Sequence, residues 1–497
     1  MDFVQNIPFF SIILSMFSGI VSSVLSGKNA KRLNTFVVFF VGVMSFVLFL
    51  YLMQKGESYI YRMGHFPAPW GNEIRAGVLE AFMAFFFCVI MLCSLIGGRK
   101  HLIKEIEENK VNLYYILVNL LLSSLLALIY TNDLFTAYVF VEINTISACG
   151  LIMIRQTGRT IEAATRYMIM SLLGSGLLLI GICLLYDLTG HLLMSYIQME
   201  IAIIVEQGMY TVPIILAIAF ISIGLAIKSA LYPFHSWLPD AYGYSTVSSS
   251  AILSSLVSKG YIFLLIKIFY RIIGFAIIRD SKIIHILFAF GICGMIMGSL
   301  GAIKENDIRR MIAFSSVAQI GYIYIGIGLG TKLAMTAGIF HIFSHAASKA
   351  LLFISAVGIT DASNESKKFA DLTGAGYRNM IAGVGFTIGS LSMVGVPLFS
   401  GFISKFMFAQ SSLQVPGKML PALIVLGIST ILNTIYFMKT VIRIYTPAKE
   451  STYEKIRFFT NLSYSVSIIC FGIVNVTLGL WSQPIVEMIQ TGLDMLA

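Results

Sequence analysis

Residues 211–240 read TVPIILAIAFISIGLAIKSALYPFHSWLPD, and they combine a membrane span with an abrupt break. About 16 uncharged, mostly apolar residues precede Lys228. That length approaches the ~20 residues that an α-helix needs to cross a bilayer. Because proline donates no N–H and clashes with the preceding turn, Pro233 and Pro239 prevent a regular helix from continuing. The stretch therefore predicts a transmembrane helix that ends in a polar, proline-containing segment beginning at a lysine.

The rest of the 497-residue chain has the same apolar character. Hydrophobic residues make up 57% of the sequence and charged residues 12%, about half the usual globular share. So few charges cannot cover the water-facing surface of a soluble protein of this size. The net charge of +10 comes from scattered Lys and Arg rather than a dense basic block, which argues against nucleic-acid binding. The composition indicates a polytopic membrane protein.

The six cysteines are too sparse for a disulfide scaffold and form no C-x-x-C pair. We therefore expect no structural metal or iron–sulfur ligands in this chain, and we interpret the cysteines as small buried apolar residues. They all fall in apolar stretches, namely Cys88, Cys93, Cys149, Cys183, Cys293 and Cys470.

Segments long and apolar enough to span a membrane recur along the whole chain. We predict an all-α polytopic membrane protein of about fourteen transmembrane helices, near 7–25, 34–53, 76–97, 112–130, 133–154, 165–187, 212–230, 247–275, 283–303, 308–330, 333–359, 379–410, 419–446 and 459–482. The twelfth segment is too long for one straight crossing and contains Gly395, Pro397 and Gly401, so it predicts a second broken helix. Two interrupted helices in corresponding halves are typical of inverted-repeat transport folds.

The loop charges predict an orientation. Loops after odd-numbered spans hold 19 Lys and Arg, including Lys449, Lys455 and Arg457, whereas loops after even-numbered spans hold 8, including Arg271. By the positive-inside rule the odd-numbered loops are cytoplasmic. We therefore expect a multi-pass protein of the cell membrane with both termini on the outer side.

Ionisable residues inside predicted spans are costly and by default mark a pathway or relay. Snorkelling to the headgroups explains one or two such lysines, and a structural ion pair could explain a lone glutamate, but neither explains a set spread over five spans. Glu80, in the third span, is a weaker candidate and is better interpreted as an ion-pair partner. The predicted proton relay consists of Glu142, Lys228, Lys259, His341, His345, Lys349 and Lys405.

The eleventh span carries three of these residues on one helical face. His341, His345 and Lys349 are spaced i, i+4, i+8, so they climb about 12 Å with gaps of roughly 6 Å, which suit intervening waters. An imidazole accepts on one nitrogen and donates from the other, as a proton relay requires. A zinc site is disfavoured because Ile342 stands where a zinc-binding H-E-x-x-H motif has glutamate.

The Glu142 and Lys228 pair offers a way to move protons stepwise. A nearby carboxylate stabilises a protonated amine, whereas burial without a counter-charge favours the neutral amine. A lysine that gains or loses its carboxylate can therefore switch between holding and releasing a proton, which arginine cannot do.

Four stretches resemble the proton-conducting, antiporter-like membrane subunits of respiratory complex I, membrane-bound hydrogenases and Mrp-type Na+/H+ antiporters. The first runs from Lys228 through Pro233, His235 and Asp240 to Ala241. The others are 305–321, 341–353 and 395–405, the last containing Pro397. The resemblance covers about residues 70–450, in order.

The resemblance implies fourteen helices with two inverted five-helix repeats, each containing a broken helix. The expected division is an N-terminal segment 1–111, repeats 112–275 and 283–446, and a C-terminal part 447–497. By motif position Glu142 and Lys228 match the family's paired residues, Lys259 matches its bridging lysine, and Lys405 matches the terminal residue of the second half-channel. Tyr242, the Ser245–Ser248 turn and Leu398 depart from the family pattern.

The preferred functional hypothesis is a proton-translocating subunit of an ion-pumping redox complex, either NADH:quinone oxidoreductase-like or a membrane-bound hydrogenase. The alternative is a subunit of an Mrp-type Na+/H+ antiporter without a redox partner. We expect no catalytic residues and no cofactor in this chain, because it has neither clustered cysteines nor a Gly-rich phosphate loop. Fe–S, flavin or NiFe centres are expected only in partner subunits. The expected partners are other membrane subunits, the lipid bilayer, H+ and possible Na+, and no nucleic acid.

Overall fold

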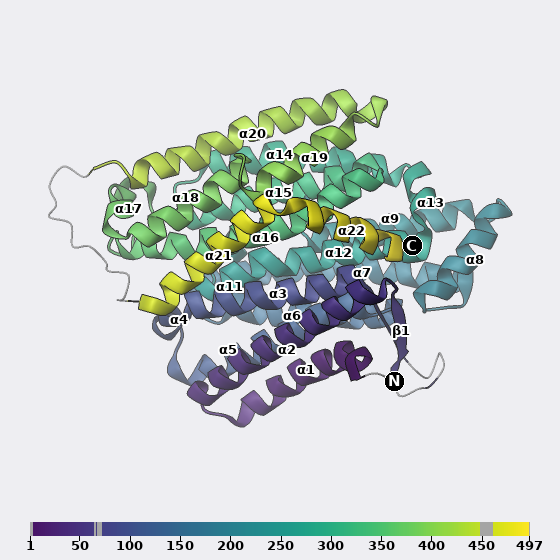
Figure 1. Ribbon diagram of the computed structural model, residues 1–497, viewed down its shortest axis with the longest axis horizontal. Coiled ribbons are helices and arrows are strands. Elements are labelled where there is room, and N and C mark those ends of the chain that lie inside the picture. The colour runs from purple at the N-terminus through teal and green to yellow at the C-terminus, as the bar shows by residue number, and fades with distance from the viewer. Residues whose placement is uncertain (1–2, 64–65, 67–71, 448–460, 497) are drawn as a thin grey trace.

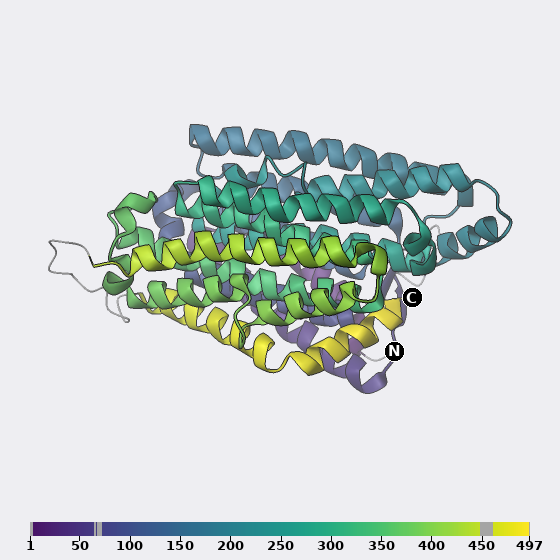
Figure 2. The same cartoon turned by 90° about the horizontal axis from the view of Figure 1, so that it is seen from above.

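The computed structural model describes residues 3–63, 66, 72–447 and 461–496. Lys449, Lys455 and Arg457, which contribute to the predicted orientation, lie outside the described residues. Long helices run roughly along the longest axis of the molecule and form one elongated bundle (Figures 1 and 2). Within the described residues, thirteen helices are long and apolar enough to cross a membrane. The protein is therefore a multi-pass membrane protein, as predicted.

The membrane-crossing helices follow the predicted order closely. Continuous spans are formed by α1 (Ile7–Val24), α2 (Gly27–Lys55), α3 (Val78–Gly97), α5 (Val111–Tyr130), α6 (Leu134–Met153), α7 (Gly158–Thr189), α9 (Thr211–Lys228), α14 (Ile283–Lys304), α15 (Ile308–Leu329), α16 (Lys332–Asp361), α20 (Pro416–Ile444) and α21 (Leu462–Leu480). The beginning of α1 and the end of α22 (Ser482–Leu496) lie at the same end of the bundle, opposite α4 (Arg99–Glu105) and α17 (Ala375–Arg378) (Figure 1).

The predicted twelfth span is broken, as its Gly and Pro residues indicate. It consists of α18 (Met380–Val394) and α19 (Ser400–Ser412), with Pro397 exposed in the connection. Gly395 has φ +91°, a left-handed conformation that favours glycine. A Cβ on Gly401 would lie 1.8 Å from the backbone oxygen of Ser392, so the two half-helices approach too closely for any side chain at this position.

The eighth span is less regular than predicted. It runs from α11 (Val247–Ile252) through the π-helical η4 (Leu253–Val257) and α12 (Ser258–Ile268) to the π-helical η5 (Phe269–Ile273). Short π-helical stretches inside α-helices are rare and often occur at functional sites. This span and α16 are entirely enclosed by other helices. Charges on either of them therefore face protein rather than lipid.

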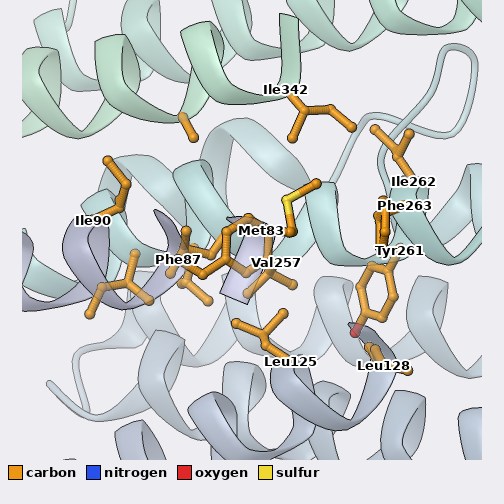
Figure 3. Packing of buried hydrophobic residues seen from close by; sticks show 14 of the residues in the cluster. Met83, Phe87, Ile90, Leu125, Leu128, Val257, Tyr261, Ile262, Phe263 and Ile342 are labelled. Carbon is orange, nitrogen blue, oxygen red and sulfur yellow. The ribbon is translucent and has the colours of Figure 1, made fainter. Parts of the chain in front are cut away.

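The apolar core packs around these two enclosed spans. Figure 3 shows Met83 and Phe87 of α3 and Leu125 of α5 meeting Val257 of η4, with Ile342 of α16 on the opposite side. Every one of these side chains is almost completely buried. The core therefore fixes the eighth span between the N-terminal helices and α16.

Several short elements lie outside the spans that the sequence predicts. They are a hairpin of β1 (Tyr59–Arg62) and β2 (Glu73–Ala76), η1 (Phe3–Asn6), η3 (Glu108–Lys110), η6 (Phe369–Leu372), α8 (Met194–Glu206), α10 (Leu238–Tyr244) and α13 (Phe275–Asp280). The hairpin is antiparallel and pairs Tyr59 with Ala76.

The expectation that all six cysteines are buried is wrong for two of them. Cys183 and Cys293 are exposed on the outside of the bundle. Both sit in spans that other helices cover only in part, so a small apolar side chain is as well suited to facing lipid as to facing the core.

Candidate functional site

The predicted pair of Glu142 and Lys228 is formed. Lys228 is the last residue of α9, and its Nζ lies 3.7 Å from Oε1 of Glu142 on α6. The Lys228 side chain is fully buried, whereas 24% of the Glu142 side chain is exposed. Ser175 of α7 donates a hydrogen bond to the same carboxylate oxygen. A cation at the carboxyl end of a helix is also stabilised by the helix dipole.

Neutral polar groups continue inward from this pair. Lys228 Nζ donates to Thr145 Oγ1 at 2.8 Å, and that hydroxyl lies 3.4 Å from the hydroxyl of Tyr261 on α12. Tyr261 in turn donates to Asn144 Oδ1 at 2.9 Å. The ion pair of α6 and α9 is thus connected by hydrogen bonds to the enclosed eighth span.

Lys259 occupies a position that the π-helical segment creates. It lies two residues after η4, and its Nζ donates to the backbone oxygen of Ser254 inside that segment. The side chain is completely buried, and no carboxylate within the described residues pairs with it. Helix α12, which carries Lys259, and the preceding η4 pack directly against α16, which bears His341, His345 and Lys349.

The three polar residues of α16 share one face, as their spacing predicts. The rings of His341 and His345 are stacked, with centroids 5.9 Å apart. Lys349 Nζ donates to the Ile312 carbonyl at 2.8 Å and to the Ser315 hydroxyl, both on α15. All three side chains of the face are completely buried.

The two histidines are only partly satisfied by protein groups. Nδ1 of His341 lies 2.8 Å from Ser404 Oγ on α19. Its Nε2 and both ring nitrogens of His345 have no hydrogen-bond partner in the described part of the chain. Buried polar groups normally bond to protein or to ordered water, so these nitrogens suit water-mediated contacts.

Lys405 connects the broken span to this face. It lies on α19, and its Nζ reaches back to the carbonyls of Met393 at 3.0 Å and Val394 at 2.7 Å, which end α18. The same Nζ lies 5.1 Å from the centroid of the Tyr322 ring, which itself stacks on His341. Lys228 ends α9 just before the turn that leads to α10, and the Nζ of Lys405 reaches from α19 across the break to the end of α18.

Hydroxyl groups hold the second break against neighbouring helices. Ser400, the first residue of α19, lies 2.7 Å from Ser344 of α16 and 3.2 Å from Ser392 of α18, oxygen to oxygen. Ser348 donates to Asn475 of α21 at 2.6 Å. These bonds give partners to hydroxyl and amide groups that are buried between the helices.

The motif-supporting residues lie at the edge of the site. Asp240 forms ion pairs with Arg310, on α15, and with Arg166, on α7, the latter at 3.0 Å. Pro233 is exposed, and the half-buried ring of His235 stacks on Tyr232. Pro233 and His235 shape the segment between α9 and α10, and Asp240 links α10 to α7 and α15.

The structure also buries cations that sequence reasoning did not place in the interior, among them Arg271, Lys267 and Arg309. Arg271, counted above as a loop residue, is instead fully buried in η5 and paired with Glu80 of α3. Lys267 donates to three carbonyls at the end of α5, those of Leu128, Ile129 and Thr131. Lys267 follows Lys259 by eight residues and Arg271 follows Lys267 by four, and this spacing was the available signal for these two.

Direct contacts join only some of the predicted residues. Glu142 meets Lys228, and His341 meets His345, whereas Lys259, Lys349 and Lys405 bond to backbone or hydroxyl groups. Within the described ranges, no group of three or more His, Cys, Asp or Glu side chains is arranged to hold a metal ion. The site is a row of separated, mostly buried, titratable groups, and neutral polar side chains connect its Lys228 end to the eighth span.

Buried titratable groups at the breaks of interrupted helices define a class of ion-translocating membrane protein, and comparison with known proteins agrees. The family model described as "NADH:quinone oxidoreductase/Mrp antiporter, TM" matches residues 131–432, so the chain belongs to this family. NADH-quinone oxidoreductase subunit N of Desulforudis audaxviator is 32% identical over 450 residues, which cover 88% of this chain and 87% of that protein.

Solved structures have the same fold. A chain of the Mrp complex from a Dietzia species has a TM-score of 0.87 at 23% identity, covering 100% of this chain and 98% of that one. A chain of an archaeal membrane-bound sulfane sulfur reductase also has a TM-score of 0.87, at 22% identity, covering 99% of this chain and 97% of that one.

Proposed function

We propose that this chain is a proton-translocating membrane subunit of an ion-pumping redox complex. The observation that carries the proposal is the contact of 3.7 Å between buried Lys228 and Glu142 at the break of α9. A purely structural role for this ion pair would not explain why two further amines, those of Lys259 and Lys349, are buried in the enclosed spans. Burying such amines is costly, and they are best explained as proton carriers.

In the proposed cycle the Glu142 carboxylate holds Lys228 in its protonated form. When the two separate, the buried amine releases its proton through Thr145 and the Tyr261 hydroxyl toward the eighth span. Lys259 receives it and connects this pair to the face of α16. The 2.8 Å and 3.4 Å hydrogen-bond distances around Thr145 are short enough for transfer with small side-chain movements.

The second half of the proposed relay runs along α16. His341, His345 and Lys349 would pass protons through waters bonded to the unpartnered ring nitrogens. Lys405, 5.1 Å from the Tyr322 ring, would exchange protons with the membrane surface through the break between α18 and α19. We propose that the two broken helices belong to the inverted repeats 112–275 and 283–446.

The alternative is a subunit of an Mrp-type Na+/H+ antiporter, which the matched family description includes by name. The two functions share the relay and differ in their partners. We favour the redox complex because the 32% identical relative is an NADH-quinone oxidoreductase subunit. Redox centres would then reside in partner chains, and the complex would lie in the plasma membrane with both termini of this chain outside.

Purification of the native complex distinguishes the two candidates. Copurification with flavin, Fe–S or NiFe proteins supports the redox complex. Copurification with small membrane subunits alone, together with Na+-dependent proton movement in vesicles, supports the antiporter and contradicts our preference.

The pair itself is tested with Lys228→Ala and Glu142→Ala in inverted membrane vesicles. We expect loss of proton translocation in both variants while the complex remains assembled, because each leaves a partner charge unpaired or locked in one protonation state. Wild-type transport in both assembled variants would contradict the proposed role.

The bridging role is tested with Lys259→Met and Lys259→Arg. Methionine removes the titratable amine, and arginine keeps the charge but does not release a proton. We expect both to abolish transport, whereas Lys439→Met, at an exposed lysine of α20, is the matched control and leaves transport unchanged. Full activity with arginine but not methionine would make Lys259 a fixed electrostatic element and would refute the stepwise relay.

A further inference from the structure

A cationic pocket lies between the start of α2 and α4, far along the chain from any relay residue. Two adjoining cavities, of about 530 and 690 Å³, meet here. Both are lined by Lys28 and Lys31 of α2, Arg99 of α4 and Ile103, and Arg32 borders the second. The start of α2 and α4 lie at the same end of the bundle (Figure 1).

The charges of this pocket are not neutralised within the chain. None of its four cationic side chains forms an ion pair or a side-chain hydrogen bond with another described residue. The only carboxylate in the lining of the two cavities is that of Glu108. Lys31 lies close enough to Arg32 and Arg99 for mutual repulsion. A pocket with this excess of unpaired positive charge is suited to binding an anion.

The backbone of α2 adds to the attraction. The 29-residue helix begins at Gly27, and the side chain of Ser26 at its N-cap position makes no capping hydrogen bond. Ser26 and Gly27 line the smaller cavity, so the positive end of the α2 dipole lies at the same pocket as Lys28 and Lys31. Phosphate groups are bound by this combination in many proteins.

An apolar surface continues directly from the cations. Phe36 and Phe39 line the larger cavity together with Arg32, and they are 61% and 56% exposed. The ring of Phe36 stacks on that of Phe40, which is also exposed, and the exposed ridge continues along α2 toward the middle of the span. Arg32 and Phe39 are separated by about 10 Å along the helix axis. The cations lie near the start of α2, and the apolar rings lie about two turns further along the same helix. This arrangement suits an amphiphilic molecule with an anionic head group and an apolar tail.

We propose that this pocket is a binding site for an anionic phospholipid, with its phosphate between Lys28, Lys31 and Arg99 and its acyl chains along Phe36 and Phe39. A soluble phosphate would use the cations but not the apolar ridge. Two adjoining cavities that share three cations provide room for two phosphates, so a diphosphatidylglycerol binds more tightly than a lipid with one phosphate. The site is independent of the proposed proton relay.

The test uses the full chain, purified in detergent and depleted of lipid, with binding measured by native mass spectrometry. Added diphosphatidylglycerol and phosphatidylglycerol should be retained, and phosphatidylcholine should not. Each interfacial cation contributes about fivefold to lipid affinity, so Lys31→Gln/Arg99→Gln should weaken binding about 25-fold. The matched control Lys304→Gln/Lys368→Gln removes two cations at the same end of the bundle and should bind as the wild type does.

Three results would overturn the proposal. The first is equal retention of anionic lipid by Lys31→Gln/Arg99→Gln and the wild type. The second is displacement of the lipid by millimolar glycerol phosphate, which has no acyl chains, because it would make the pocket a site for a soluble anion. The third is cross-linking of Arg99 to an acidic segment of a partner subunit in the intact complex, with no lipid retained there.

Discussion

The pair of Glu80 and Arg271 provides a sharp test of how charge is tolerated inside this bundle. The exposed fractions of the two side chains are 0% and 2%, and one hydrogen bond joins them. Glu80 Oε2 and the Nε and Nη1 atoms of Arg271 have no hydrogen-bond partner among the described residues. Glu80→Gln therefore leaves a buried guanidinium without its counter-charge.

Removing one partner of a buried ion pair costs about 3–5 kcal/mol, and we expect a loss of this size for Glu80→Gln and for Arg271→Met. The combined variant Glu80→Gln/Arg271→Met removes both charges and should be within about 1 kcal/mol of the wild type. The three variants thus form a double-mutant cycle with a coupling of several kcal/mol.

Thermal unfolding of the purified chain in detergent ranks the stability of the variants. Unfolding is monitored through the reaction of the buried cysteines with a thiol dye. The expected order places the two single variants well below the wild type and the combined variant near it. Wild-type stability of both single variants would show that water or lipid headgroups already solvate these charges. A combined variant as unstable as the singles would show that the pair is held by packing rather than by charge.

Two other predictions concern the break in the twelfth span and the orientation. A Cβ on Gly401 would lie 1.8 Å from Ser392 O, so Gly401→Ala should sharply lower the yield of folded protein in a detergent-extraction assay. The control Gly417→Ala has open space around its Cβ and should not lower the yield. Equal yields would contradict the close approach. The positive-inside orientation places exposed Gln207 outside the cell and exposed Asn29 inside. An impermeant thiol reagent added to intact cells should therefore label a cysteine at position 207 but not one at position 29. The reverse labelling pattern would show that the membrane orientation is inverted.

The sequence predicts the spans well because each is a long apolar run, a signal that tertiary contacts rarely override. The break in the twelfth span is also predictable, since Gly395 and Pro397 cannot lie inside a regular helix. The π-helical η4 is different. It depends on how the eighth span packs between α3, α5 and α16, and no residue type marks it in advance.

The site shows the same division. Spacing alone places His341, His345 and Lys349 on one face, and the family resemblance supplies the pairing of Glu142 with Lys228. Arg271 was misassigned because it stands near the end of an apolar run, where a lysine or arginine normally reaches the headgroups. Only the three-dimensional position of Glu80, 191 residues away in the chain, explains its burial.

The lysines of the row differ in what holds them, and this difference has a consequence for their occupancy. Lys228 faces a carboxylate, whereas Lys259, Lys349 and Lys405 donate to backbone carbonyls. When a carbonyl-held lysine gives up its proton, it leaves behind a neutral dipole and no bare anion. The carbonyls therefore leave the positive charge of a protonated amine at these positions without a counter-anion in contact. In the proposed relay such a row would disfavour full occupancy, because each further proton would add positive charge, and a proton arriving at one position would promote departure from another without any direct contact between the two.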